Sequence, residues 1–167
     1  EGQDDATFFK MICSKVLARN LEDKVLVLPT GGSSIDSFIN ISYFKKNGRD
    51  LFLILDSDKG IAFKNPEKPV KQQSTVDNFS EKFGASYLLN KSNIESYFHP
   101  RAVERRYHHL EEGSIHFFDD DEYLVDFFKE KRISKKHNTQ IFDLMTKEEF
   151  EEVVEQEFLD FLKEITN

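Results

Sequence analysis

The stretch LFLILDSDKG, residues 51–60, places five apolar residues directly before two aspartates that stand one residue apart. A continuous apolar run of this length is typical of a parallel strand that is buried on both faces. In open α/β sheets the ligand lies beyond the carboxyl ends of the strands. Two carboxylates at that edge are costly unless a positive charge lies between them. We therefore expect Asp56 and Asp58 to hold a divalent cation.

Helices and strands are expected to alternate around this strand, because apolar spacing, cap residues and turn residues change in step along the chain. Helices are predicted over 6–19, 34–46 and 74–83, and further strands over 24–29 and 85–89. The polar segment 59–73 contains two prolines and is expected to be a loop. Such alternation predicts an α/β fold with a central, mainly parallel sheet and crossover helices. On this reading a first strand is expected before residue 1.

The pattern changes after about residue 98, where strand signals give way to helical ones. Helices are predicted over 100–112, 122–132 and 147–165. We expect residues 1–98 to form a catalytic core and residues 99–167 to form a helical C-terminal extension of the same domain.

Composition narrows the function classes. The net charge of −8 excludes a simple basic nucleic-acid binder, so any such binding must use local Lys and Arg clusters or metal ions. A single cysteine, Cys13, rules out an internal disulfide and a cysteine-based zinc site, which favours a reducing, cytoplasmic setting. No apolar run approaches the ~20 residues that a membrane-spanning helix needs, so no membrane association is expected.

Further acids fall at the ends of the predicted strands. Glu1 and Asp5 flank the junction before the first helix, and Glu95 follows the 85–89 strand. The carboxyl ends of parallel strands share one edge of a sheet, so these acids should converge with Asp56 and Asp58. Five carboxylates supply enough oxygen ligands for one or two Mg²⁺ or Mn²⁺ ions.

Four segments in this order resemble the Toprim domain of the OLD (overcoming lysogenization defect) family nucleases. They are EGQDD at 1–5, LPTGG at 28–32, LILDSDKG at 53–60 and LNKSNIESYF at 89–98. The resemblance covers about residues 1–100. It implies a Rossmann-like Toprim fold and a metal-dependent endonuclease or nickase that hydrolyses DNA. It also implies an ABC-type ATPase domain before this chain, association into homo-oligomers through parts outside it, and, from the family alone, a role in antiphage defence.

The resemblance also assigns roles to the acids. Asp56 and Asp58 are expected to hold one ion with Glu1, while Asp5 and Glu95 hold the second and Glu1 bridges the two. Family members often have a serine where this chain has Asn93, whose amide oxygen is a further candidate ligand. Two metals ~3.5–4 Å apart would activate a water and stabilise the leaving oxygen of a phosphodiester.

Family members carry a later lysine near the chemistry, and Lys135 and Lys136 are the two candidates here. Such a lysine would offset negative charge in the transition state. Arg101, Arg105 and Arg106 lie near one face of the predicted 100–112 helix and are candidates for contacts to backbone phosphates. A solvated face explains the arginines equally well, and a solvated pair is the ordinary interpretation of the lysines.

Two other enzyme classes remain open. A haloacid dehalogenase-like phosphatase or phosphotransferase also follows a strand with DxD and uses the first aspartate as a nucleophile, although the EGxxD unit before the DxD argues against it. A Toprim domain of primase or topoisomerase type uses the same Glu and DxD for nucleotidyl transfer or strand passage. Structurally, Asp56 and Asp58 are also compatible with an Asx turn, and Glu95 with a solvated surface acid.

Overall fold

The apolar run at 51–55 forms strand β1, Leu53–Leu55, in a computed structural model that describes residues 3–21, 25–28, 50–67 and 72–167. Strand β2, Ser86–Leu88, pairs with β1 in parallel, with Leu53 opposite Ser86 and Leu55 opposite Leu88. The strands predicted over 51–55 and 85–89 are confirmed, although each is shorter than expected. Within the described residues the sheet consists of these two strands, so the protein is mixed α/β.

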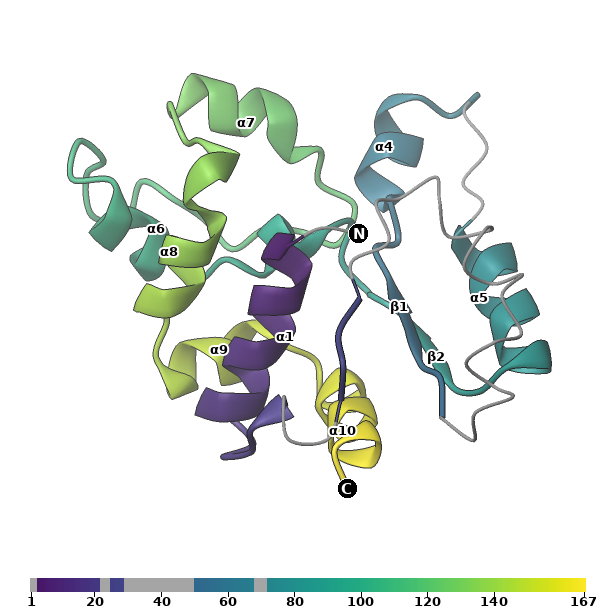
Figure 1. Ribbon diagram of the computed structural model, residues 1–167. Helices are drawn as coiled ribbons and strands as arrows, with labels where there is room; N and C mark the ends of the chain where they lie inside the picture. Colours follow the sequence, from purple (N-terminus) through teal and green to yellow (C-terminus); the bar gives the residue numbers. More distant parts are fainter. Residues whose placement is uncertain (1–2, 22–24, 29–49, 68–71) are drawn as a thin grey trace.

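Helices make up most of the rest of the described chain (Figure 1). The α-helices are α1 Gln3–Lys15, α4 Lys59–Lys64, α5 Gln72–Lys82, α6 Pro100–Arg106, α7 Leu124–Glu130, α8 Asn138–Leu144, α9 Lys147–Val153 and α10 Gln156–Ile165. The described residues also form two short 3₁₀ helices, η3 Ile94–Tyr97 and η4 Lys135–His137. None of the described helices is long and apolar enough to cross a membrane.

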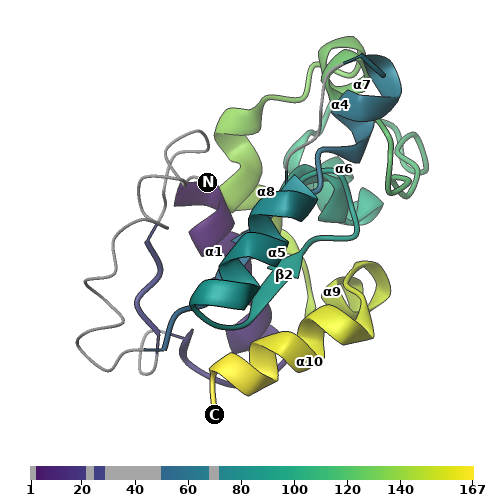
Figure 2. The same ribbon diagram turned by 90° about the vertical axis from the view of Figure 1, so that its right-hand side faces the viewer.

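Helices cover both faces of the sheet, which explains the unbroken apolar run of β1. Leu53 and Leu55 point to one face and pack against Val76 and Phe79 of α5. Phe52 and Ile54 alternate with them and pack against the main hydrophobic cluster on the other face. In Figures 1 and 2 the strands lie between α5 on one side and α1 with α10 on the other. Both faces of the sheet are therefore covered by packed side chains.

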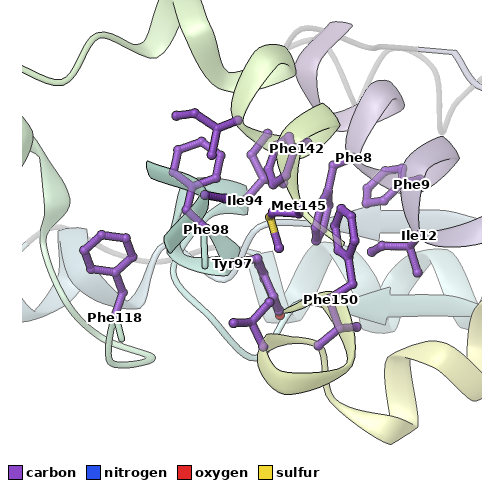
Figure 3. Close-up of a cluster of buried hydrophobic side chains, with 14 of the residues drawn as sticks. Phe8, Phe9, Ile12, Ile94, Tyr97, Phe98, Phe118, Phe142, Met145 and Phe150 are labelled. Carbon is purple, nitrogen blue, oxygen red and sulfur yellow. The ribbon is translucent and has the colours of Figure 1, made fainter. Parts of the chain in front are cut away.

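The main core is built from aromatic rings, which accounts for the 17 phenylalanines of the chain. Phe8 of α1 is fully buried, with its ring centre 4.8 Å from that of Phe142 in α8 and 5.2 Å from that of Tyr97 in η3 (Figure 3). Phe150 of α9 and Phe158 of α10 also surround it. The helices after residue 98 therefore share one core with α1 and the sheet.

Three predicted elements differ from the structure, namely those over 59–73, 100–112 and 147–165. The segment 59–73 is not simply a loop, because α4 begins directly after Asp58 and ends before Pro66, which cannot continue a helix. The predicted helix over 100–112 ends at Arg106, because Tyr107 leaves helical geometry and its hydroxyl pairs with the backbone of Ser134.

The predicted helix over 147–165 is two helices, α9 and α10, with extended backbone at Val154 and Glu155 between them. Val153 and Val154 are both buried, and β-branched residues favour extended backbone. Helix α8 was not predicted at all, because its seven residues are too few for a clear apolar period.

The predicted strand over 24–29 and helix over 34–46 fall mostly outside the described residues. Residues 25–28 are described and form no regular element. Val25 and Val27 pack against the main cluster, whereas Leu26 and Leu28 are exposed. This alternation matches an extended segment, although no strand pairing is described for it.

Candidate functional site

Hydrogen bonds join the segment after β1 to the segment after β2 at the carboxyl edge of the sheet. The Ser57 hydroxyl donates to the Lys91 carbonyl at 2.8 Å, and the Asp58 N–H donates to the Ser92 carbonyl at 2.9 Å. The Gly60 N–H donates to the Ser92 hydroxyl at 2.9 Å. These contacts explain why serine separates the two aspartates and place the DxD segment beside the segment that leads to Glu95.

Gly60 is required by close packing. A Cβ atom at this position would lie 2.5 Å from the carbonyl oxygen of Glu122 and 2.9 Å from the hydroxyl oxygen of Ser92. A side chain would push α4 away from the loop before α7. The DSDKG sequence thus brings α4 against that loop at the edge of the sheet.

Asp58 has left-handed backbone geometry, with φ 54° and ψ 20°, and precedes the first residue of α4. Its carboxylate accepts a hydrogen bond from the Gln72 side chain at the start of α5. Aspartate is among the few residues other than glycine that adopt this conformation readily, but the conformation still has a free-energy cost. Strain of this kind often marks functional sites.

Glu95 is the most deeply buried acid in this region, at 5% exposure. It lies in η3, which Asn93 caps by accepting from the N–H of Ser96 at 3.3 Å. The ammonium of Lys135 lies 2.8 Å from Glu95 Oε1, and Asn138 Nδ2 donates to the same oxygen at 3.0 Å. A buried carboxylate with these partners is not the solvated surface acid that the sequence alone allowed.

The first turn of α1 approaches the same place. The side chain of Thr139 in α8 donates to Asp4 Oδ1 at 3.2 Å, which ties the start of α1 to the segment that carries Lys135. Asp4 and Asp5 lie in the first turn of α1. Acids at a helix N-terminus are stabilised by the helix dipole, so this position has a structural benefit as well.

These segments line one open pocket of about 460 Å³. Its acidic wall comes from α1, the DxD loop and η3, and comprises Asp4, Asp5, Asp56, Asp58 and Glu95. Lys135 is the basic residue among the described residues that line it. Ile61, Tyr123 and Val125 form an apolar rim where α4 faces the start of α7. In Figure 1 the upper end of β1, where α4 begins, lies near the N-terminal end of α1.

Most of the residues that the sequence singled out come together here. Besides the predicted acids, the pocket includes Asn93 and Lys135. Lys136 is exposed and does not line the pocket, so the geometry separates two lysines that the sequence could not. Glu1 lies outside the described residues, as does the LPTGG turn from residue 29 onward.

The three arginines do not join this pocket. Both terminal nitrogens of Arg105 donate to the carboxylate of Glu149, at 2.8 and 2.6 Å, and bind α6 to α9. Arg106 donates to Gln140 at 2.6 Å and contacts His137. Arg101 is exposed and lines a separate hollow beside the buried His99. Two of the three guanidinium groups are therefore engaged within the protein.

Asn138 and Gln72 are site residues that the sequence analysis missed. Asn138 follows Lys135 by three residues, and residues three apart lie on one face of a 3₁₀ helix. That spacing could have identified Asn138 as a further candidate for the site once Lys135 was one. Gln72 offers no such signal, because only the return of α5 toward the DxD loop brings it to Asp58.

The donor chemistry of the pocket suits a hard divalent cation, because its potential ligands are carboxylate and amide oxygens. Within the described residues, no group of three His, Cys, Asp or Glu side chains stands ready to hold one ion. Ligation of one ion therefore requires side-chain movement or oxygen ligands from other residues. Asn138 is such a residue in the pocket, whereas Asn93 Oδ1 already accepts from the N–H and the hydroxyl of Ser96 at 3.3 and 3.2 Å. Lys135 already shows that Glu95 attracts a cation.

Comparison of the chain with protein-family models, with curated proteins and with solved structures found no match.

Proposed function

We propose that this chain is the catalytic module of a Mg²⁺- or Mn²⁺-dependent nuclease that hydrolyses phosphodiester bonds in DNA. The observation that carries the proposal is the pocket itself. Asp5, Asp56, Asp58, Glu95 and Lys135 come from four distant parts of the sequence and line one cavity at the carboxyl edge of a parallel sheet. Evenly scattered surface charges would not collect in this way.

The residues of the pocket divide into two groups by their position. Asp56 and Asp58 follow β1 and would hold one ion, with Glu1 as a further ligand. Asp5 and Glu95 would hold the second from α1 and η3. Two bound divalent ions would supply an activated water and neutralise charge on the phosphate and the leaving oxygen.

Lys135 is the residue best placed to interact with the scissile phosphate. Its side chain is 58% exposed while its ammonium contacts the buried Glu95, so it reaches from the surface to the acidic wall. A lysine at this position would orient a phosphate and stabilise negative charge that develops in the transition state. Lys136 is outside the pocket and has no such part in the proposal.

The acidic pocket also predicts how DNA binds. Five carboxylates against one lysine repel a phosphate backbone when no cation is present. The net charge of −8 adds to that repulsion. DNA binding by this module should therefore depend on divalent ions, as cleavage does.

The Toprim domain of OLD-family nucleases remains the proposed relationship. It is supported by the order of the four segments, by the two parallel strands, and by the meeting of the first, third and fourth segments at the pocket. The helix predicted over 34–46 and residues 29–32 of the second segment, which this relationship also needs, lie outside the described residues.

Cleavage of supercoiled plasmid tests the proposal, with Mg²⁺, Mn²⁺ or EDTA, in the wild type and in Asp56→Asn. We expect metal-dependent nicking that Asp56→Asn lowers by at least about 100-fold. Asp77→Asn is the matched control, because Asp77 is an exposed acid on α5 and does not line the pocket.

Equal nicking by the wild type and Asp56→Asn would contradict the proposal. Release of phosphate from a small phosphoester without nicking would favour the haloacid dehalogenase-type alternative. Nucleotidyl transfer or relaxation without hydrolysis would favour a primase or topoisomerase type.

A further inference from the structure

Asn138 carries a buried oxygen with no hydrogen-bond partner. The residue is 2% exposed and lines the acidic pocket. Its Nδ2 donates to Glu95 Oε1 at 3.0 Å, whereas its Oδ1 has no partner among the described residues. Nearly all buried polar atoms in folded proteins are hydrogen-bonded, so an unpartnered one calls for an explanation.

The chemistry of Glu95 fixes which end of the amide is which. An ionised carboxylate only accepts hydrogen bonds, so the end of the Asn138 amide that contacts Glu95 Oε1 is the nitrogen, and the end without a partner is the carbonyl oxygen. Reversing the amide would set a carbonyl oxygen against a carboxylate and lose the donor at 3.0 Å. The unpartnered atom is therefore a carbonyl oxygen held in a fixed position next to a buried acid.

The surroundings indicate what this oxygen binds. A phosphate or another anion would be repelled by Oδ1 and by the five carboxylates of the pocket. A divalent cation is attracted by the same groups, and neutral amide oxygens are ordinary ligands of Ca²⁺ and related hard cations. We propose that Asn138 is a metal ligand, and that its Oδ1 binds the divalent cation held by Glu95.

The position of Lys135 is consistent with this assignment. Its ammonium lies 2.8 Å from Glu95 Oε1, the same oxygen that receives the amide of Asn138. A cation shared by Glu95 and Asn138 would replace the ammonium as the positive charge at that carboxylate. Lys135 would then be released toward the open side of the pocket, where a substrate phosphate enters. The inference rests on the metal site of the proposed function, but not on cleavage.

Binding of Mn²⁺ alone, measured by calorimetry and by electron paramagnetic resonance without DNA, tests the inference. Asn138→Leu removes both polar atoms, and Asn138→Asp keeps an oxygen but removes the donor to Glu95. We expect Asn138→Leu to weaken Mn²⁺ binding by about 10-fold or more, and Asn138→Asp to match or exceed the wild type. Gln140→Leu is the control, because it removes an amide from the same helix outside the pocket.

The two variants separate ligation from positioning. If Asn138 served only to orient Glu95 through Nδ2, both variants would lose affinity, and the inference would be wrong. Equal Mn²⁺ affinity in the wild type and Asn138→Leu would overturn it too, as would a wild type that binds no Mn²⁺ at millimolar concentration.

A measurement on the wild type alone covers the case in which the variants do not fold. In a Mg²⁺ titration followed by NMR, the side-chain amide resonance of Asn138 should shift and saturate with the metal. An unchanged resonance at saturating Mg²⁺ would overturn the inference. If Mn²⁺ binds through Asn138 but the wild type does not nick plasmid, the nuclease proposal fails while this inference stands.

Discussion

At the scale of single residues, Asp58 has two roles, because it is the residue before α4 and a ligand in the proposed metal site. The backbone must take a left-handed conformation there, with φ 54°, so that α4 can begin directly after the strand loop. Glycine would adopt this conformation at lower cost, but glycine has no carboxylate. We interpret the aspartate as a compromise in which some stability is given up for a ligand at the edge of the sheet.

This interpretation predicts a difference between two variants of Asp58. Both Asp58→Gly and Asp58→Ala should lose metal-dependent nicking. Asp58→Gly should be more stable than Asp58→Ala by about 1 kcal/mol in the free energy of unfolding, because only alanine pays for the left-handed backbone. Urea unfolding measures this, and equal stability would show that the positive φ carries no strain.

Lys135 and Lys136 differ in the structure although they are neighbours in the sequence. Lys135→Ala should lower nicking at saturating Mg²⁺ by about 100-fold, because it removes the charge that faces the phosphate. It should not weaken Mn²⁺ binding, since Lys135 competes with a cation for Glu95. Lys136→Ala should leave both unchanged. Plasmid nicking and Mn²⁺ calorimetry report the two effects separately, and the reverse pattern would exchange the roles of the lysines.

At the scale of elements, the Arg105–Glu149 ion pair joins α6 to α9, and His99, which caps α6, lies 3.6 Å from the same carboxylate. Arg105 binds the carboxylate of Glu149 with two hydrogen bonds, and the N–H of Thr146 donates to the same group. Burial opposes ionisation of Glu149. The hydrogen bonds from Arg105 and Thr146 outweigh it, and the pKa of Glu149 falls below its ordinary value of 4.5.

Arg105→Ala should therefore destabilise the protein in a pH-dependent way. At pH 7 it should cost about 1–3 kcal/mol, because Glu149 is left buried and charged with fewer partners. A carboxyl whose pKa is lowered by folding contributes stability above its unfolded pKa and loses it as the pH falls through the folded value. The difference from the wild type should narrow below about pH 4.5.

Thermal unfolding across this pH range measures the effect. Arg101→Ala is the matched control on the same helix, because Arg101 is exposed and Arg105 is the arginine that binds Glu149. A pH-independent loss of stability in Arg105→Ala would mean that the guanidinium acts through packing alone.

The sequence predicted some elements better than others for physical reasons. Strand β1 packs against hydrophobic clusters on both faces and β2 is partly buried beside it, so their apolar runs stand out. The break between α9 and α10 could not be predicted from the sequence, because the helical apolar spacing continues across Val154 and Glu155 although their backbone is extended. Helix ends were missed where a tertiary contact decides them, as at Tyr107.

At the scale of the whole molecule, the aromatic core joins the two parts that the sequence distinguished at residue 98. Figure 3 shows rings from η3, α8 and α9 around Phe8 of α1. The ring of Phe158 in α10 lies 6.4 Å from it between ring centres. Phe8→Ala should cost about 3–5 kcal/mol, the usual range for a buried ring. Chemical denaturation should show one cooperative transition in both proteins, whereas two separate transitions would mean that the helical part folds independently.

The sequence predicted much of the candidate site, because parallel strands bring their carboxyl ends to one edge and Asp56, Asp58 and Glu95 follow such ends. It could not choose between Lys135 and Lys136, because that choice depends on how η4 packs against η3. It could not find Asn138 either, since an unpartnered oxygen is visible only in three dimensions.

The central claim is that the pocket holds divalent cations, and a crystal structure grown with Mn²⁺ tests it most directly. Anomalous scattering at the manganese edge locates the ions without any assumption about activity. We predict a manganese peak inside the pocket, about 2–2.6 Å from oxygens of Asp56 or Asp58 on one side or of Glu95 on the other. A crystal saturated with Mn²⁺ that shows no peak in the pocket, in a protein that still nicks plasmid, would contradict the account.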